Sequence, residues 1–174
     1  MNTRRQLSLF VPVAEGVQLE SVRHELDPVQ SELIPAHVTL CREDEIGQLS
    51  ASEIQARLQG CGAKPLTLSF GPPMIFRGHG VLLPCVAGES EFHELRAHLL
   101  GTTAIRRPHI TLAHPRNPRS AKWALPETVA LPQTLSYTFV EIASIEQVGG
   151  AAWRVIREFR LILSIPAKMT VHSG

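Results

Sequence analysis

Two short stretches of the 174-residue chain share one pattern: PAHVTLCRED at residues 35–44 and RRPHITLAHPR at residues 106–116. Each contains His-apolar-Thr-Leu directly after a bend that includes a proline. In a β-strand, side chains two positions apart point to the same face and lie about 6.6–6.8 Å apart. The His and the Thr of each copy therefore share one face, with apolar residues behind them: His37 and Thr39 in the first copy, His109 and Thr111 in the second.

Two imidazoles and two hydroxyls around one small volume suit the cleavage of a phosphodiester. This reaction needs a base for the attacking oxygen, an acid for the departing oxygen and donors for the non-bridging oxygens. Imidazole, with an ordinary pKa near 6.5, can take either proton-transfer role, and a threonine hydroxyl can donate to phosphate without adding charge. We therefore predict that His37 and His109 are catalytic and that Thr39 and Thr111 bind the phosphate.

The segments around the two motifs alternate between strand and helix patterns. Period-two and β-branched runs predict strands, and helical spacing with a Ser50/Glu53 capping box predicts helices. The predicted strands lie at residues 5–13, 37–41, 66–87 (two or three, broken by Gly and Pro) and 109–114, the helices at 14–29, 50–62 and 90–101, and a hairpin closed by Gly149-Gly150 at 135–163. This mixture indicates an α+β fold with antiparallel sheets, and the repeated order of helix and motif indicates two lobes related by a pseudo-two-fold.

Composition predicts one domain over residues 1–165, followed by a flexible tail at 166–174. A chain of this length with 44% hydrophobic residues can bury a core without staples. The formal net charge of +1 excludes the broad positive field of proteins that track long duplex nucleic acid. Any recognition of phosphate must therefore be local.

Three cysteines and eight histidines show no arrangement typical of disulfide frameworks or metal sites. The cysteines, at 41, 61 and 85, cannot all pair and form no C-x-x-C motif, which predicts reduced thiols in the cytoplasm. Neither H-x-x-x-H nor a Cys/His quartet with zinc spacing is present, so we expect no metal and no other cofactor. No run approaches the roughly 18 apolar residues of a membrane span. The sequence also indicates no obligate protein partner.

Charge is distributed unevenly along the chain. Residues 96–122 contain no acid but six basic residues, whereas residues 15–53 contain nine acids and only Arg23 and Arg42 as basic residues. The six are Arg96, Arg106, Arg107, Arg116, Arg119 and Lys122. This pattern fits equally a basic rim for an RNA end and an ordinary solvated surface. Arg107, next to Pro108 and the second motif, is the best single rim candidate.

The paired HVTL and HITL resemble the signature of the 2H phosphoesterase superfamily. With the opening LFVPV, the chain length and the order of elements, they are most similar to the 2′-5′ RNA ligase family, also called RNA 2′,3′-cyclic phosphodiesterases, over about residues 4–163. The resemblance implies a bilobal fold with the active cleft between the lobes. It also implies metal-independent opening of 2′,3′-cyclic phosphates of RNA ends or nucleotides to 2′-phosphates. His37 would protonate the departing ribose oxygen, His109 would activate water, and the roles would exchange in 2′-5′ ligation.

Three further positions are weaker candidates for contact with substrate. His114 stands where members of the family often have an arginine, Phe10 lies in the family-like LFV and is a candidate to stack on a base, and Cys41 continues the alternation of His37 and Thr39 toward the floor of the site. Two other functions stay open: a binding module for nucleotides or RNA ends that does not turn them over, and a 2H enzyme for 2′-5′ linkages or another cyclic phosphate.

Overall fold

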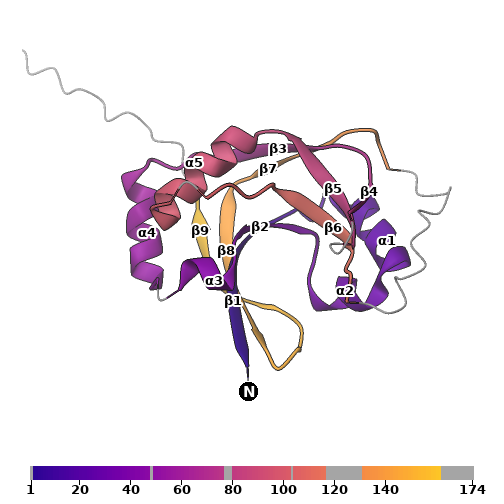
Figure 1. Ribbon diagram of the computed structural model, residues 1–174, viewed down its shortest axis with the longest axis horizontal. Coiled ribbons are helices and arrows are strands. Elements are labelled where there is room, and N and C mark those ends of the chain that lie inside the picture. The colour runs from indigo at the N-terminus through magenta and orange to yellow at the C-terminus, as the bar shows by residue number, and fades with distance from the viewer. Residues whose placement is uncertain (1, 48, 77–79, 103, 117–130, 162–174) are drawn as a thin grey trace, which may run out of the picture.

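The computed structural model describes residues 2–47, 49–76, 80–102, 104–116 and 131–161. These residues form the predicted α+β fold, in which a curled antiparallel sheet carries a few helices (Figure 1). The tail expected at 166–174 lies outside the described residues, as do Arg119 and Lys122. The single domain over residues 1–165 stays a prediction.

The elements follow one another along the described chain in the predicted mixture of strands and helices. The strands are β1 (Thr3–Phe10), β2 (His37–Cys41), β3 (Leu66–Phe70), β4 (Met74–Phe76), β5 (Gly80–Ala87), β6 (His109–Ala113), β7 (Leu135–Phe139), β8 (Glu141–Val148) and β9 (Arg154–Arg160). The helices are α1 (Val17–Leu26), α2 (Pro28–Leu33), α3 (Glu43–Ile46), α4 (Ala51–Gly60) and α5 (Glu89–Leu100).

The strands lie in the order β7-β3-β5-β6-β2-β1-β8-β9, with β4 beside β5, and all registered neighbours are antiparallel. The motif strands β2 and β6 are neighbours in the middle of this order. The two antiparallel sheets expected from the sequence are therefore two halves that join at the motif strands. Helices α1 and α2 lie at one end of the curl and α4 and α5 at the other (Figure 1). The pseudo-two-fold relation stays a prediction.

The helix predicted at residues 14–29 is two helices, because the chain turns at Asp27 and Pro28. Proline has no N–H for the helical hydrogen bond, so it suits the first position of a new helix. The Asp27 carboxylate accepts the Gln30 N–H at 3.0 Å and caps α2. The capping box of Ser50 and Glu53 is confirmed at the start of α4.

The first arm of the hairpin predicted at 135–163 is two strands that separate at Val140. Strand β7 pairs with β3 in one half of the sheet, and β8 pairs with β1 and β9 in the other. The period of buried positions breaks at this point: Tyr137 and Phe139 are buried, and the next buried residues are Ile142 and Ala143. Ile142 and Ala143 are adjacent and therefore point to opposite faces, so β8 is covered on both faces after the chain changes partners.

The core lies behind the motif strands and under the helices. Val38, Leu40, Ile110 and Leu112 have no exposed surface, which confirms that the apolar positions of the motifs face inward. In α5, which confirms the helix predicted at residues 90–101, a stripe of Phe92, Leu95 and Leu99 is buried in the same cluster. In the part of the chain that the structure describes, no helix has both the length and the apolar character needed to cross a bilayer.

Candidate active site

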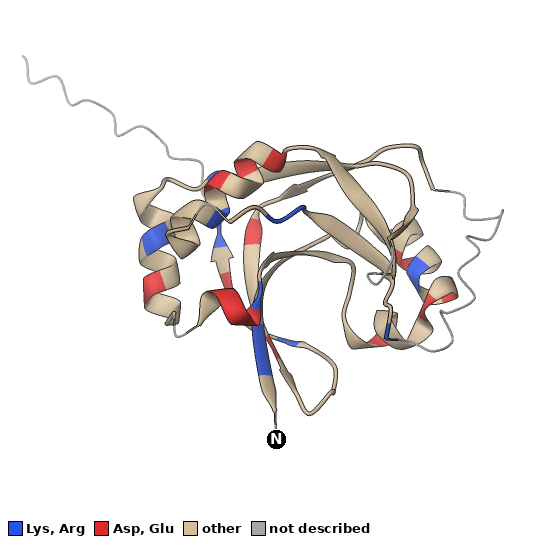
Figure 2. Cartoon of the chain, viewed as in Figure 1, with Lys and Arg blue, Asp and Glu red and all other residues tan. Residues whose placement is uncertain are grey.

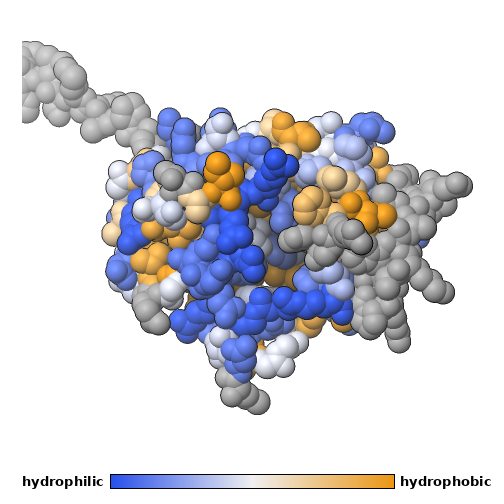
Figure 3. All heavy atoms as spheres, in the orientation of Figure 1, coloured by the Kyte–Doolittle hydropathy of each residue, from blue (hydrophilic) through white to orange (hydrophobic). Residues whose placement is uncertain are grey.

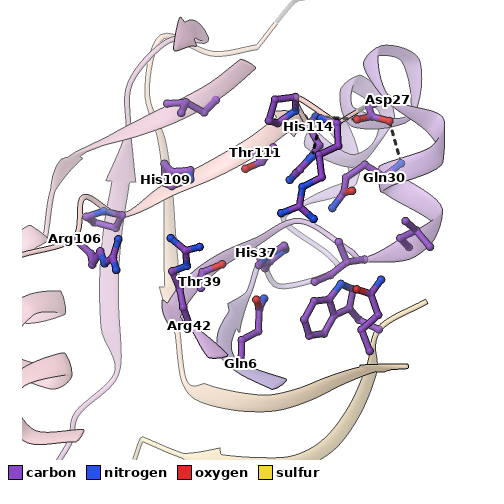
Figure 4. Close-up of a pocket in the computed structure, with 18 of the residues that line it drawn as sticks. Gln6, Asp27, Gln30, His37, Thr39, Arg42, Arg106, His109, Thr111 and His114 are labelled. Atoms are coloured by element: carbon purple, nitrogen blue, oxygen red, sulfur yellow. Dashed lines mark hydrogen bonds between the residues drawn. The ribbon is translucent and has the colours of Figure 1, made fainter. Parts of the chain in front are cut away.

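The two motif strands present their functional side chains on the face opposite the core. Strands β2 and β6 have the same burial pattern, in which the His and Thr positions are partly exposed and the positions between and after them are buried. Figure 4 shows His37, Thr39, His109 and Thr111 around one pocket. The convergence predicted from the sequence is therefore present in the structure.

The antiparallel register of the two strands explains how the four side chains meet. Val38 is paired with Ile110. In an antiparallel pair centred on these two residues, the imidazole of each motif lies beside the hydroxyl of the other, because cross-strand neighbours share a face. Two imidazoles and two hydroxyls thus alternate around one point.

The four side chains line a cavity of about 1700 Å³ that is open to solvent. On the side of β4 and β5 the lining is apolar, with Met74, Phe76 and Leu82. The other contributors are mostly polar or basic, among them Gln6, Gln30, Arg42, Arg106, Arg107, Arg116 and His114, and the aromatic Trp153 joins them. Such a cavity offers space for a nucleotide as well as for its phosphate.

Both catalytic candidates are held in the same tautomer by main-chain carbonyls. The His37 Nδ1–H donates to the Pro35 carbonyl at 2.8 Å, and the His109 Nδ1–H donates to the Arg107 carbonyl at 3.0 Å. Because a carbonyl only accepts, Nδ1 must carry the hydrogen in each ring. In the neutral ring the lone pair then lies on Nε2, which can take up a proton.

The surroundings of His37 favour its neutral form. Burial lowers the pKa of His37 to about 4, although the hydrogen bond to the Pro35 carbonyl acts in the opposite direction. The charges of Arg23 and His109 lower this pKa further. In the ligand-free protein His37 is therefore uncharged at neutral pH.

The structure adds Arg23 to the site, although in the sequence this residue stands out only as one of two basic residues in an acidic segment. Its side chain is 1% exposed and lines the cavity from α1. Its guanidinium forms an ion pair with Glu20 at 2.5 Å and donates to the main chain of both motif regions. Arg23 follows Leu19 by four positions and therefore shares a face of the helix with it, and this spacing is the sequence signal that points to Arg23.

The rim candidates Arg107, His114 and Phe10 have different surroundings. Arg107 is exposed and lines the cavity, as does the half-buried His114. Burial, and then the charge of Arg116, lower the pKa of His114. Phe10 packs against the small cluster of Ile34, Ala143 and Ile145, and its ring centroid lies 6.0 Å from that of His37. Phe10 thus supports the His37 ring from the side, and its stacking on a base stays a prediction.

The places of Arg96 and Cys41 differ from those that the sequence indicates. Arg96 does not belong to a basic rim, because it is 2% exposed and pairs with Glu45 at 2.8 Å. Cys41 does not form the floor of the site. A register shift in the pairing of β1 with β2 places it in the core, where burial raises its pKa to about 12.

Charged side chains from both sides of the paired motif strands β2 and β6 complete the rim of the cavity. Figure 2 shows the acidic helix α3 beside β1 and a basic stretch that leads into β6. Arg106 is tied to Glu45 at 2.9 Å, whereas Arg42, Arg107 and Arg116 are exposed side chains that line the cavity. Among the described residues, no three His, Cys, Asp or Glu side chains form a group that could hold a metal ion.

An α+β fold whose curled antiparallel sheet carries the paired HxTx strands at its centre is the arrangement expected of a 2H phosphoesterase. Residues 11–151 match the model of the 2′-5′ RNA ligase superfamily. The chain therefore belongs to the 2′-5′ RNA ligase superfamily, and the resemblance drawn from the two motifs is confirmed. Membership supports a role as a phosphoesterase or ligase.

Solved structures with the same fold are similar over nearly the whole chain. E. coli LigT complexed with ATP has 19% sequence identity and a TM-score of 0.59, with 91% of this chain and 98% of LigT covered. A phosphoesterase has 17% identity and a TM-score of 0.55, with 92% of this chain and 99% of the phosphoesterase covered. The protein TT0787 of Thermus thermophilus has 17% identity and a TM-score of 0.52, with 91% of this chain and 97% of TT0787 covered. No curated protein matches the chain. At these identities the structural matches establish the fold alone.

Proposed function

We propose that the protein is a metal-independent phosphodiesterase that opens 2′,3′-cyclic phosphates of RNA ends or nucleotides to 2′-phosphates. The observation that carries the proposal is the convergence of His37, Thr39, His109 and Thr111 on one cavity, with Nδ1 of both rings engaged by carbonyls. Structures of LigT with ATP, NADP+ and 3′-AMP support a ligand of nucleotide size.

The four side chains divide the reaction as follows. Nε2 of His109 accepts a proton from water as the water oxygen attacks phosphorus. The bond from phosphorus to the 3′-oxygen breaks, and His37 gives its Nε2 proton to that oxygen, which leaves a 2′-phosphate. The hydroxyls of Thr39 and Thr111 donate to the non-bridging oxygens, whose negative charge grows in the transition state. In ligation, the 5′-hydroxyl of a second RNA end takes the place of water: His109 accepts its proton, His37 protonates the departing 3′-oxygen, and a 2′-5′ linkage is formed. The two imidazoles exchange roles when that linkage is cleaved back to the cyclic phosphate.

The donor role of His37 requires that substrate raise its pKa. In the ligand-free protein burial holds this pKa at about 4, so the ring carries no proton on Nε2 at neutral pH. A phosphate in the cavity places negative charge beside the ring and favours the imidazolium. Substrate binding thus charges the acid at the place where its proton is needed.

Cytoplasmic location is part of the proposal. Cys41, Cys61 and Cys85 are all free thiols in the structure, in agreement with a reducing compartment.

A hydrolysis assay on nucleoside 2′,3′-cyclic phosphates and on RNA ends with the same group tests the proposal. His37→Ala and His109→Ala should each lower kcat by at least about 100-fold, because each positioned acid or base typically contributes about 10²–10⁴. His98→Ala, on the exposed face of α5, is the matched control. Full activity of either motif variant would disprove the catalytic assignment.

The same assay separates the alternatives. Hydrolysis that persists in EDTA supports metal independence, and loss of hydrolysis in EDTA contradicts it. Tight binding of the cyclic phosphate without any product would identify a non-catalytic binding module. Cleavage of 2′-5′-linked dinucleotides but not of cyclic phosphates would identify a 2H enzyme with a different substrate.

A further inference from the structure

The two half-sites meet at a weakly paired seam. Within the sheet, β2 and β6 are registered at the single pair of Val38 and Ile110. By contrast, β1 and β8 are registered continuously from Thr3–Val148 to Ser8–Ala143. A site that needs both motifs around one phosphate therefore depends on further ties across the seam.

Two buried arginines cross this seam in opposite directions. Arg23 lies on α1, in the segment before the first motif, and its Nε donates to the carbonyl of Thr111 in the second motif at 3.1 Å. Arg96 lies on α5, in the segment before the second motif, and its Nη1 donates to the carbonyl of Leu40 in the first motif. Each helix thus holds the motif strand of the other half.

Arg23 also controls the turn that orients His37. Its Nη2 donates to the Ile34 carbonyl at 2.9 Å, and its ion-pair partner Glu20 accepts the Ala36 N–H at 2.5 Å. These two main-chain groups flank Pro35, whose carbonyl holds the His37 Nδ1–H. One ion pair therefore fixes the direction of the His37 ring and connects it to the main chain of Thr111.

Arg96 has a corresponding set of contacts in the other half. It donates to both carboxylate oxygens of Glu45, at 2.8 and 3.2 Å. The same carboxylate accepts from Arg106 at 2.9 Å. Arg106 directly precedes Arg107, whose carbonyl holds the His109 Nδ1–H. The orientation of His109 is thus connected through Glu45 to the main chain of β2.

We infer that Arg23 and Arg96 are positioning residues that hold the two half-sites at the spacing and ring orientation that one phosphate requires. Buried ion pairs add little net stability, because the cost of desolvation offsets the attraction of the charges. Their benefit here lies in geometry, since a planar guanidinium holds several carbonyl and carboxylate acceptors in fixed directions. The catalytic consequence rests on the proposed function, whereas the orientation of the rings is a property of the ligand-free protein.

Arg23→Lys and Arg96→Lys test the inference, because lysine keeps the charge but cannot hold acceptors in a planar fork. We expect each variant to lower kcat for a nucleoside 2′,3′-cyclic phosphate by about 10–100-fold, with KM changed less than about 3-fold. Long-range ¹H–¹⁵N spectra should show a single Nδ1–H tautomer of His37 in the wild type and a mixture of tautomers in Arg23→Lys.

Leu58→Ala is the control for a loss of stability alone. Leu58 is buried in α4, in the core rather than at the seam. We expect this variant to lower the melting temperature but to keep the wild-type kcat, well below that temperature, and the wild-type His37 spectrum. Equal loss of kcat in Leu58→Ala would assign the effect of the arginines to stability and overturn the inference.

Other outcomes are equally decisive. Wild-type kcat and an unchanged His37 spectrum in Arg23→Lys would overturn the inference. If the arginine variants do not fold, Glu20→Gln takes their place, because it keeps Arg23 but removes the carboxylate charge that Arg23 and the Ala36 N–H both contact; an unchanged His37 spectrum in that variant would also overturn the inference. If the wild type hydrolyses no cyclic phosphate, the proposed function fails, and the spectra still decide whether Arg23 orients His37.

Discussion

At the scale of single residues, the main chain decides what each histidine can do. The carbonyl two positions before each imidazole accepts its Nδ1–H, in Pro35 for His37 and in Arg107 for His109. In the proposed mechanism this contact leaves Nε2 as the nitrogen that exchanges a proton with substrate. The tetrapeptide alone therefore does not define the proposed catalytic unit, which begins two residues earlier.

The titration of His37 depends on whether the cleft is filled. Burial lowers its pKa to about 4, so we expect the ligand-free ring to stay neutral above about pH 5. Inorganic phosphate should raise this pKa, because the anion stabilises the imidazolium. NMR titration with and without phosphate measures both values. A free pKa near 6.5 would contradict the effect of burial, and a pKa insensitive to phosphate would place the anion elsewhere.

The same shift affects folding. In the unfolded chain His37 has its ordinary pKa of 6.5, so between about pH 4 and 6.5 the unfolded state binds more protons than the folded one. The free energy of unfolding should therefore rise with pH through this window, and His37→Gln should reduce the rise.

The two threonine hydroxyls can be removed without a change of shape at Cβ. Thr39→Val and Thr111→Val should each lower kcat/KM for cyclic phosphate hydrolysis by about 10–100-fold, because each removes one donor to the phosphate. The fold should persist, since both side chains face the cavity rather than the core. Thr138→Val, on the exposed side of β7, is the control. Unchanged kcat/KM in both motif variants would remove the threonines from the phosphate site.

At the scale of elements, α3 connects parts of the chain that the sequence does not associate. Glu45 receives hydrogen bonds from Arg96 of α5, from Arg106 before β6 and from the Arg42 N–H at its own N-cap. Burial alone would raise the pKa of Glu45, but these donors outweigh it and hold the pKa at about 2. The carboxylate therefore stays charged well into the acid range.

This network should make stability sensitive to acid. The folded pKa of Glu45 lies below its ordinary value of 4.5, so its contribution is complete above about pH 4.5 and is lost as the pH falls toward 2. Glu45→Gln should lower the free energy of unfolding at pH 7 by about 3 kcal/mol, since it leaves the buried Arg96 charge without its partner. Urea denaturation at several pH values measures both effects. Asp44→Asn, at an exposed neighbour, should behave like the wild type.

Elements that rest on local signals are predictable from the sequence, and those that rest on distant partners are not. The capping box of α4 and the helix predicted at residues 90–101 are confirmed because their causes lie within one helix. The break at Val140 depends on the choice of strand partners, and the burial of Arg96 depends on Glu45, which lies 51 residues away. The convergence of the motifs was predictable because repetition itself signals a shared site.

At the scale of the whole molecule, a net charge of +1 coexists with a locally basic cleft. In the orientation of Figure 1, hydrophilic residues cover much of the middle of the surface (Figure 3). Arg42, Arg107 and Arg116 are exposed and line the cavity, whereas Arg96 and Glu45, which also line it, neutralise each other as an ion pair. The sequence predicted local recognition of phosphate from the overall charge, but only the fold separates rim arginines from structural ones.

Salt dependence follows from this distribution. A nucleoside 2′,3′-cyclic phosphate brings one charge to the motifs, whereas an RNA end adds upstream phosphates that can reach the rim arginines. Each phosphate that a single strand places against a cation contributes about −0.7 to the slope of log affinity against log salt. We therefore expect KM for an RNA oligonucleotide to rise with salt more steeply than KM for the mononucleotide, and kcat to change little.

Arg107→Ala should reduce the salt slope for the oligonucleotide by about 0.7 and leave the slope for the mononucleotide unchanged. Arg5 is paired with Glu146 on β8, and Arg5→Ala should change neither slope. Equal slopes for the two substrates in the wild type would show that the upstream strand does not contact the rim, and would make a small nucleotide the better candidate for the substrate.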